Sequence, residues 1–111
     1  RLQNAGGLAQ KAGRLFSGVD QVRECLERGA ARLVIVSEDA SANTLDNFRY
    51  MADSLGVEFV QALPMEEWGA ALGSKPRATL AVTDASFARK IYHEIEIYKD
   101  LTTVRSSQDK R

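Results

Sequence analysis

The sequence predicts an α/β fold, a three-layer α/β/α sandwich built from a single domain. Short apolar runs rich in β-branched residues alternate along the chain with segments whose apolar residues recur every three or four positions. Alternating strands and helices are typical of sheets covered by helices on both faces. The 111 residues suffice for about one domain. We expect right-handed crossovers and mostly parallel strands.

The first third of the chain contains two predicted helices and two predicted strands. A short helix is expected over residues 5–13, and a strand-like piece follows at residues 15–17. A second helix covers residues 19–28, with its apolar residues at helical spacing. Residues 33–37 form a β-branched apolar run bounded by polar residues, which indicates a buried strand.

The remainder of the chain predicts three more helices and two more strands. A turn with helix-capping residues leads into a helix over residues 42–55, followed by a strand over residues 57–62. Pro64 opens a short helix that ends at Gly73. Another strand covers residues 78–83, after which Asp84 can cap a final helix.

The organisation that follows from this pattern is one domain over residues 5–99. From about residue 100 the chain turns polar, and we predict a flexible C-terminal tail over residues 100–111. The sequence shows no internal repeat and no interdomain linker.

Several features favour a cytoplasmic monomer without a membrane anchor. The longest apolar run, residues 33–36, is far too short to span a bilayer. We see no charged-then-apolar leader before a cleavage site. The single cysteine, Cys25, cannot form an intrachain disulfide, which suits a reducing compartment.

Charge is unevenly distributed although the 15 basic and 15 acidic residues cancel. Residues 1–37 hold six Lys/Arg and three Asp/Glu (+3), residues 38–72 hold one and seven (−6), and residues 73–111 hold eight and five (+3). A zero net charge argues against bulk, non-specific nucleic-acid binding. If the fold brings the two ends together, the protein has a basic face and an acidic face.

Catalytic and metal-binding patterns are weak, so we predict no enzyme activity, no metal and no cofactor. The one histidine, His93, has the pattern of an exposed helix residue, and Cys25 has that of a core residue. Asp39 and Asp84 each follow a predicted strand, where they can bind magnesium or cap the next helix. Helix capping, by Asp39 or Ser41 in the first case and by Asp84 in the second, is the simpler interpretation. A metal-dependent enzyme using these two acids remains a rival.

Two segments are candidates for binding. Gly18 precedes a helix that exposes Gln21, Glu24 and Arg28 on one face, and a helix N-terminus offers free N–H groups to a phosphate or a base edge. The compact loop over residues 73–77 carries two positive charges around a proline.

The order of short motifs resembles one protein family. The matching stretches are Gly7-Leu8-Ala9-Gln10-Lys11-Ala12-Gly13, Ser17-Gly18, Leu26 to Ser41, Asn43-Thr44, Leu72-Gly73 and Ala81-Val82-Thr83-Asp84. In this order and spacing they are similar to the bacterial YlxQ type within the L7Ae/L30e family of ribosomal proteins. The resemblance covers about residues 5–91.

The resemblance implies an α/β/α fold around a mixed four-stranded sheet, and binding to structured RNA such as a kink-turn. In that family the helix after the glycine inserts its N-terminal end into a major groove widened by the kink. The family's Asn-Glu pair falls on Asp20 and Gln21, and a family lysine falls on Glu24. The loop that covers a flipped-out nucleotide falls on residues 73–77. The replacement at Glu24 adds repulsion toward phosphates.

We therefore predict a non-enzymatic protein that binds structured, ribosomal or translation-related RNA. Residues Lys11, Arg14, Arg28, Arg32, Lys75 and Arg77 are expected to supply compensating positive charge if they share one face. The predicted RNA-binding residues are Lys11, Arg14, Gly18, Asp20, Gln21, Glu24, Arg28, Arg32, Gly73, Ser74, Lys75, Pro76 and Arg77. The alternative is a protein-interaction module whose acidic stretch, residues 38–67, docks a ribosomal or translation protein.

Overall fold

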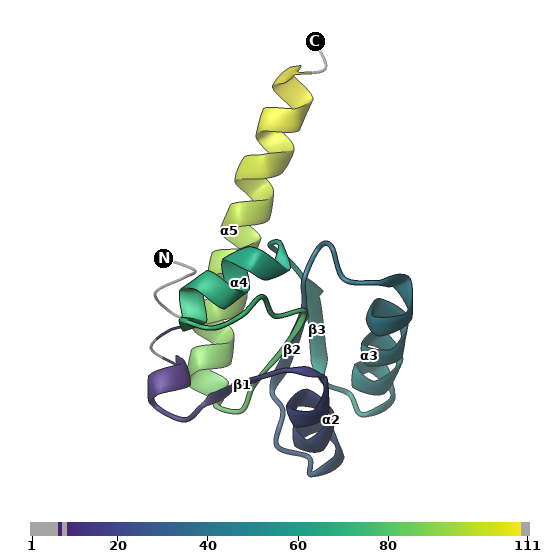
Figure 1. The fold of residues 1–111 in the computed structure, drawn as a ribbon. Helices are drawn as coiled ribbons and strands as arrows, with labels where there is room; N and C mark the ends of the chain where they lie inside the picture. Colours follow the sequence, from purple (N-terminus) through teal and green to yellow (C-terminus); the bar gives the residue numbers. More distant parts are fainter. Residues whose placement is uncertain (1–6, 8, 110–111) are drawn as a thin grey trace.

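The computed structural model describes residue 7 and residues 9–109 (Figure 1). Residues 9–11 are helical, while residues 5, 6 and 8 of the helix predicted over 5–13 lie outside the described part. The later elements are β1 (Leu15–Ser17), α2 (Val19–Glu27), β2 (Leu33–Val36), α3 (Ala42–Ser54), β3 (Glu58–Gln61), α4 (Met65–Leu72), β4 (Thr79–Val82) and α5 (Ala85–Asp109).

The four strands form one mixed sheet in the order β1-β4-β2-β3. Only β2 and β3 are parallel, and β4 runs antiparallel to both β1 and β2. The family-based expectation of a mixed sheet is therefore confirmed, and the expectation of mostly parallel strands is wrong. Strand β4 runs opposite to β2 and β3 because the short connection through α4 starts at the end of β3 and enters β4 at the same end of the sheet. A parallel strand would need a crossover to the opposite end.

Helices cover both faces of the sheet, which confirms the three-layer α/β/α architecture (Figure 1). Strand β2 is buried along its whole length, and its side chains alternate between the two faces. Leu33 and Ile35 pack in the cluster with α4 and α5. Val34 and Val36 pack in the second cluster with α2 and α3.

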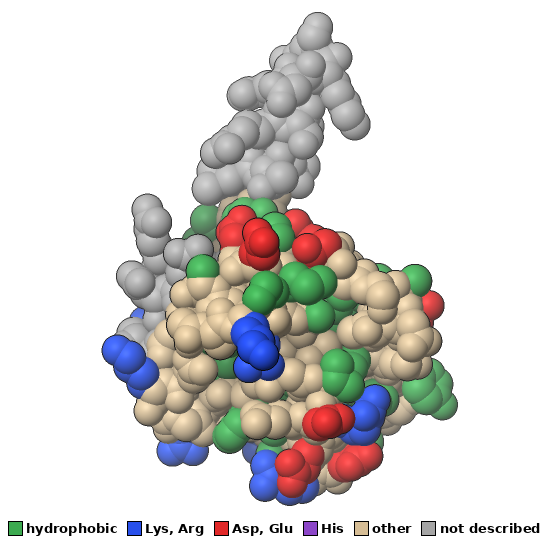
Figure 2. Space-filling model, in the orientation of Figure 1, with side chains coloured by type: hydrophobic (Ala, Val, Ile, Leu, Met, Phe, Trp, Pro, Cys, Tyr) green, Lys and Arg blue, Asp and Glu red, His purple; other side chains and the backbone are tan. Residues whose placement is uncertain are grey.

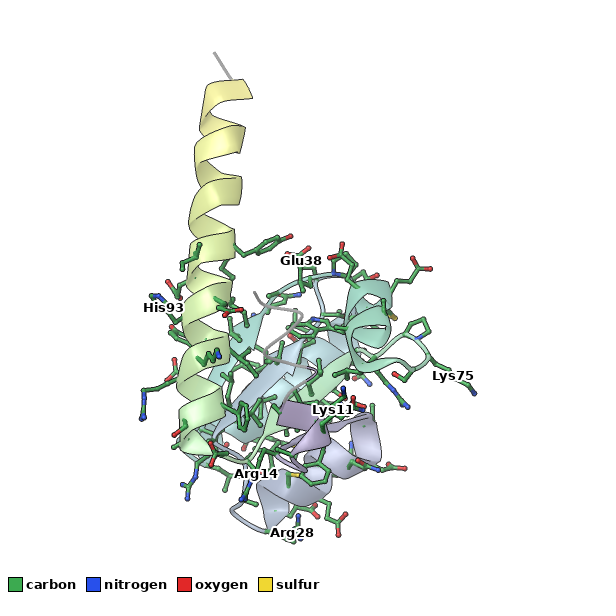
Figure 3. The ribbon with its side chains drawn as sticks, turned by 90° about the vertical axis from the view of Figure 1, so that its left-hand side faces the viewer. Lys11, Arg14, Arg28, Glu38, Lys75 and His93 are labelled. Atoms are coloured by element: carbon green, nitrogen blue, oxygen red, sulfur yellow. The ribbon has the colours of Figure 1, made fainter. Side chains whose placement is uncertain are left out.

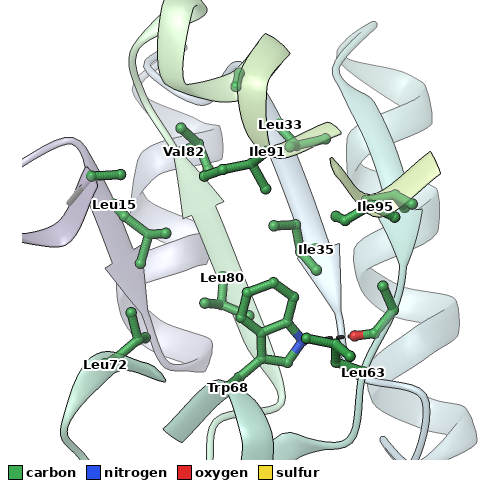
Figure 4. Close-up of a cluster of buried hydrophobic side chains, with 14 residues drawn as sticks. Leu15, Leu33, Ile35, Leu63, Trp68, Leu72, Leu80, Val82, Ile91 and Ile95 are labelled. Carbon is green, nitrogen blue, oxygen red and sulfur yellow. Dashed lines mark hydrogen bonds between the residues drawn. The ribbon is translucent and has the colours of Figure 1, made fainter. Parts of the chain in front are cut away.

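Trp68 attaches α4 to the first of these clusters (Figure 4). Its side chain is fully buried, and its indole Nε1 donates a hydrogen bond of 2.6 Å to the carbonyl oxygen of Ala62. A buried indole N–H needs such a partner. This bond fixes α4 against the end of β3, and with it the start of the loop that leads to β4.

The last helix is longer than the sequence pattern indicates. Asp84 accepts a hydrogen bond of 3.0 Å from the backbone N–H of Phe87, which caps α5 as expected. The helix then continues to Asp109, where a flexible tail from residue 100 was predicted. No glycine or proline interrupts residues 85–109, so no backbone signal ends the helix there. Among the described residues, no helix combines the length and apolarity needed to cross a membrane.

Candidate nucleic-acid interface

The two ends of the sheet carry different parts of the predicted site. At one end, Gly18 donates a hydrogen bond of 3.1 Å to the carbonyl oxygen of Thr79, and Ser37 donates one of 2.9 Å to Ala78. We call this the Gly18 end. At the other, the Arg14 end, the carbonyl of Arg14 accepts from the N–H of Thr83 at 2.8 Å. The ends are about 13 Å apart, because each strand rises about 3.3 Å per residue.

Gly18 begins α2 in a backbone conformation that other residues avoid. Its φ is 101° and its ψ 148°, and no side chain caps the first turn of the helix. This region of φ/ψ space is essentially restricted to glycine. The first N–H groups of α2 are therefore not bonded to a capping side chain, and they keep the positive end of the helix dipole open to a ligand.

The predicted loop over residues 73–77 is folded back on α4. Gly73 ends the helix with a left-handed φ of 66°, and Ser74 donates a backbone hydrogen bond of 2.8 Å to Gly69. The N–H of Arg77 donates to the carbonyl oxygen of Met65 at 3.0 Å. Both ends of the loop are thus bonded to the helix, which holds the loop in one position.

Gly69, which was not among the predicted site residues, allows this loop to pack closely against α4. It lies in the interior of α4 and is buried. A Cβ added there would collide with the backbone of Lys75 and Pro76. The sequence held a signal for it, because a glycine inside an otherwise helical segment usually has a packing reason.

The loop and the start of α2, far apart in the sequence, meet at the Gly18 end. A Cβ placed on Gly18 would lie 3.5 Å from Nη1 of Arg77. The Nε of Arg77 is 3.4 Å from the hydroxyl oxygen of Ser74, to which it donates. The guanidinium of Arg77 therefore stands beside the open N-terminus of α2, where both favour an anion.

The first turns of α2 present polar side chains to solvent next to this arginine. Asp20, Gln21 and Glu24 are all exposed. The carboxylate of Asp20 lies 3.8 Å from Nη1 of Arg23, which partly offsets its charge. Arg23 was not predicted as a site residue. Its guanidinium carbon is 5.8 Å from the ring centre of Phe48, so the side chain leans on α3.

The other predicted cations do not join Lys75 and Arg77. The backbone N–H of Arg32 donates a hydrogen bond to the carbonyl oxygen of Val82, at the Arg14 end. Arg28 follows the last turn of α2, and this helix runs away from Gly18. Figure 3 shows Arg14 and Arg28 well separated from Lys75. Lys11 is exposed at the end of the helical residues 9–11, before Arg14. The structure thus places Arg14, Arg28 and Arg32 at the far end, so the six cations do not share one face.

The two acids considered for magnesium accept hydrogen bonds from backbone N–H groups at the starts of helices, at opposite ends of the sheet. The helix that follows Asp39 directly, α3, is capped by Ser41, which accepts from the N–H of Thr44 at 3.1 Å. Asp39, which follows β2, accepts a hydrogen bond of 2.9 Å from the N–H of Met65, the first residue of α4. This bond holds the pKa of Asp39 below its usual value. Asp84 follows the antiparallel β4 and caps α5. Since β2 and β4 end on opposite sides, these carboxylates cannot share an ion.

The remaining candidates for chemistry lie apart from each other. Cys25 is buried in the cluster between α2, α3 and the sheet, and His93 is exposed on α5 (Figure 3). Among the described residues, no three His, Cys, Asp or Glu side chains are grouped closely enough to hold a metal ion.

Comparison with known proteins identifies the family of this chain. Residues 1–92 match the model of a protein family described as ribosomal protein L7Ae/L30e/S12e/Gadd45. The chain belongs to this family. The match includes α2, the loop over residues 73–77 and the first turns of α5.

Relatives of similar length support this assignment. The chain is 33% identical to the RNA-binding protein YlxQ of Bacillus subtilis (strain 168) over 85 residues, which are 77% of this chain and 85% of that protein. It is 29% identical to the RNA-binding protein YlxQ of Enterococcus faecium over 96 residues, which cover 86% and 92% of the two chains. The resemblance to YlxQ-type proteins is therefore confirmed.

Solved structures show the same fold. A protein of unknown function from Bacillus halodurans C matches with a TM-score of 0.80 and 30% identity, over 86% of this chain and 97% of that one. The Giardia lamblia 15.5kD RNA binding protein matches with a TM-score of 0.73 over 86% and 85% of the two chains. Its 19% identity shows a shared fold only.

Proposed function

We propose that this protein binds structured RNA, and that it reads kink-turns with the start of α2 and the loop over residues 73–77. The YlxQ relatives are named as RNA-binding proteins, and the family assignment extends that activity to this chain. The proposed role is that of a cytoplasmic, non-enzymatic protein acting on ribosomal or other translation-related RNA.

The observation that carries this proposal is the position of Arg77, whose Nη1 would lie 3.5 Å from a Cβ built on Gly18. The guanidinium therefore lies beside the uncapped N-terminus of α2, and a phosphate bound there would meet N–H donors and a cation together. The side chains of Asp20 and Gln21 project from the same turn of the helix. Gln21 can donate to and accept from a base edge, and Asp20 can accept from one.

The charge of this surface predicts recognition by shape more than by bulk attraction. Glu24 repels phosphates, and only Lys75 and Arg77 of the six predicted cations belong to the loop. A site with few cations loses less affinity when salt is raised, because few counterions are released on binding. We therefore expect moderate affinity that depends on the kinked geometry of the RNA.

A titration with two RNAs tests the proposal. One is a short kink-turn duplex and the other a straight duplex of equal length, each measured at two salt concentrations. We expect preferential binding to the kink-turn that persists at the higher salt. Equal, weak binding to both duplexes that disappears at higher salt would show that the protein has no kink-turn site.

A second candidate function is a protein-interaction module of the translation machinery. It is favoured by an acidic surface over the start of α4 (Figure 2). The exposed acids there are Glu38, Asp39, Glu66 and Glu67. A basic partner protein that remains bound after nuclease treatment, and is released by Glu66→Lys with Glu67→Lys, would support this function over RNA binding.

A further inference from the structure

A cavity of about 360 Å³ lies between the first turns of α5 and the start of β2 and β3. We call it the α5 cavity. Ligand sites in proteins measure roughly 300–1,000 Å³, so the volume suits a small molecule or one residue of a chain. The α5 cavity is at the Arg14 end of the sheet, because Leu33 pairs there with Val82. It is lined by Arg32, Leu33, Glu58, Ala85, Ala88, Arg89 and Tyr92.

The walls of the α5 cavity are regular elements held by backbone hydrogen bonds. Its four residues from α5 are spaced by three or four positions, so they form one stripe of the helix. The N–H of Ala88 donates to the carbonyl oxygen of Asp84 at 2.9 Å. On the opposite wall, Leu33 and Glu58 are partners in the parallel pairing of β2 with β3. The cavity is therefore formed before a ligand binds.

The floor of the α5 cavity is apolar. Leu33 is 1% exposed and Ala88 is 8% exposed, and both belong to the core cluster beneath α5. Tyr92 is partly buried and packs against the same cluster. An aliphatic group of a ligand would remove apolar surface from water here, which favours binding.

The rim carries two cations and one anion, since Arg32, Arg89 and Glu58 are all exposed. In the part of the chain that the structure describes, neither guanidinium forms an ion pair or a side-chain hydrogen bond. Glu58 is engaged with Tyr92, because Glu96 and, to a smaller extent, Glu58 accept from its hydroxyl and hold the pKa of Tyr92 above its usual value. The lining thus has a net charge of +1, with both arginines available to a ligand.

These charges fit a ligand with a single negative charge. A guanidinium presents its N–H donors in a planar fork that matches a carboxylate. A phosphate monoester carries up to two negative charges and would be repelled more strongly by Glu58. An RNA phosphodiester has one charge, but its sugar offers no aliphatic group to cover Leu33 and Ala88. A carboxylate attached to an aliphatic group uses both the rim and the floor.

We propose that the α5 cavity binds a carboxylate that carries a small branched aliphatic group. Arg32 and Arg89 bind the carboxylate, and the floor receives the aliphatic group. Two sources supply this chemistry, a free short-chain acid and the C-terminal residue of a polypeptide. The site is distinct from the RNA site proposed at the Gly18 end, which lies at the opposite end of the sheet.

Chemical shifts of the folded protein during ligand titrations test this proposal. The probe is isovalerate, and we expect it to shift the signals of Leu33, Ala88 and Arg89 and to leave Gly18 unmoved. Isovaleramide has the same aliphatic group without the charge, and acetate has the charge without the branched group. Both should bind at least several-fold more weakly. Equal binding of isovaleramide, acetate or inorganic phosphate would overturn the proposed site.

A short peptide distinguishes the two sources. A glycine-rich tetrapeptide that ends in valine carries the isovalerate skeleton on a chain. Tighter binding of this peptide than of isovalerate, lost when its C-terminus is amidated, would support a polypeptide C-terminus as the ligand. Tighter binding of isovalerate would support a free acid. Absence of binding by both would overturn the proposal.

Two neighbouring cations of α5 provide a matched pair of variants. Arg89→Gln removes a charge from the rim, and we expect isovalerate affinity to fall about fivefold, the effect of losing one solvent-exposed ion pair. Lys90→Gln removes the same charge from the next residue, which is exposed but does not line the cavity, and should have a smaller effect. Equal weakening by the two variants would mean attraction by overall charge and would overturn the site.

Filling the α5 cavity tests the position of the aliphatic group. Ala85 is exposed at the rim, so Ala85→Leu adds an aliphatic side chain without overpacking the core and without changing the charge. We expect this variant to weaken isovalerate binding at least several-fold, because its side chain occupies the space of the ligand. Unchanged affinity in a folded Ala85→Leu variant would overturn the proposed site.

Discussion

Gly69 and Lys75 approach each other so closely that no side chain fits between them. The contact joins the middle of α4 to the centre of the loop over residues 73–77. An alanine in the middle of a helix is usually better than glycine by roughly 1 kcal/mol, so the glycine has a cost that the packing of the loop offsets.

Replacing Gly69 by alanine is expected to destabilise the protein and to displace the loop. The added methyl group collides with backbone atoms that cannot rotate away, which typically costs about 1–3 kcal/mol in the free energy of unfolding. Urea denaturation measures this cost, and a kink-turn titration measures the decrease in RNA affinity. Ala70→Gly is the control, because it weakens the same helix at an exposed position without touching the loop. Unchanged stability in Gly69→Ala would contradict the observed packing.

Gly18→Ala is expected to reduce both stability and RNA binding. Its φ of 101° is unfavourable for any residue with a Cβ, at a cost of about 1–3 kcal/mol. The new methyl would also stand beside Arg77, where we place the RNA backbone. Gly29→Ala is the matched control, since φ is 73° there and open space surrounds the site. If both variants lose RNA affinity equally, Gly18 has no specific role.

The two groups of cations are expected to differ in their effect on RNA binding. Lys75→Ala with Arg77→Ala removes the cations of the Gly18 end, and the slope of log K against log salt should become shallower by about 0.7–0.9 for each phosphate that is no longer neutralised. Arg14→Ala with Arg32→Ala removes the same charge from the opposite end and should leave the slope nearly unchanged. Binding isotherms at four salt concentrations give both slopes. A larger effect of the Arg14 pair would place the RNA at the other end of the sheet.

Thr79→Val is expected to leave the protein as stable or to stabilise it. The side chain is fully buried in β4, and its hydroxyl has no hydrogen-bond partner among the described residues. Valine has nearly the same shape, and removing an unsatisfied buried hydroxyl avoids a desolvation cost of about 1–3 kcal/mol. Thermal unfolding measures the change. Val82→Thr, which introduces a hydroxyl at a buried position of the same strand, should destabilise the protein and serves as the control.

Asp39 is expected to make stability depend on pH in the acid range. The N–H of Met65 donates to its carboxylate and holds its pKa below the usual 3.8. A carboxyl whose pKa is lower in the folded state contributes stability that is fully present above the unfolded pKa and is lost as pH falls through the folded one. Unfolding curves between about pH 2 and about pH 6 should show a smaller acid destabilisation in Asp39→Asn. Asp46→Asn is the control for removing one exposed charge.

The elements of the fold could be predicted from the sequence because their signals are local. The apolar run of β2, the glycines after α2 and α4 and the cap at Asp84 each specify a boundary without knowledge of the rest. The direction of β4 could not be predicted in this way. It depends on where the short connection through α4 lies, and that is set by tertiary contacts such as the bond from Trp68 to Ala62.

Part of the candidate site could also be predicted from the sequence, because the signals for that part are local. Gly18 and the loop over residues 73–77 have local signatures, and the structure brings them together. Grouping the six cations required knowing at which end of the sheet each one lies. That follows from strand order, which put Arg14 and Arg32 away from Arg77. The roles of all these residues in RNA binding stay predictions.

The position of β4 between β1 and β2 has a consequence for the order in which the chain can fold. Among the described residues, the one strand that pairs with β1 lies more than 60 residues later, because Leu15 pairs with Val82. During synthesis β2 and β3 can pair as soon as both have left the ribosome, but β1 must wait until residue 82 has emerged. Closing so long a loop is slow relative to local contacts. The surface around Gly18 and Arg77 therefore cannot form before β4 has emerged, and a fragment that ends before β4 would lack the strand that holds β1 in place.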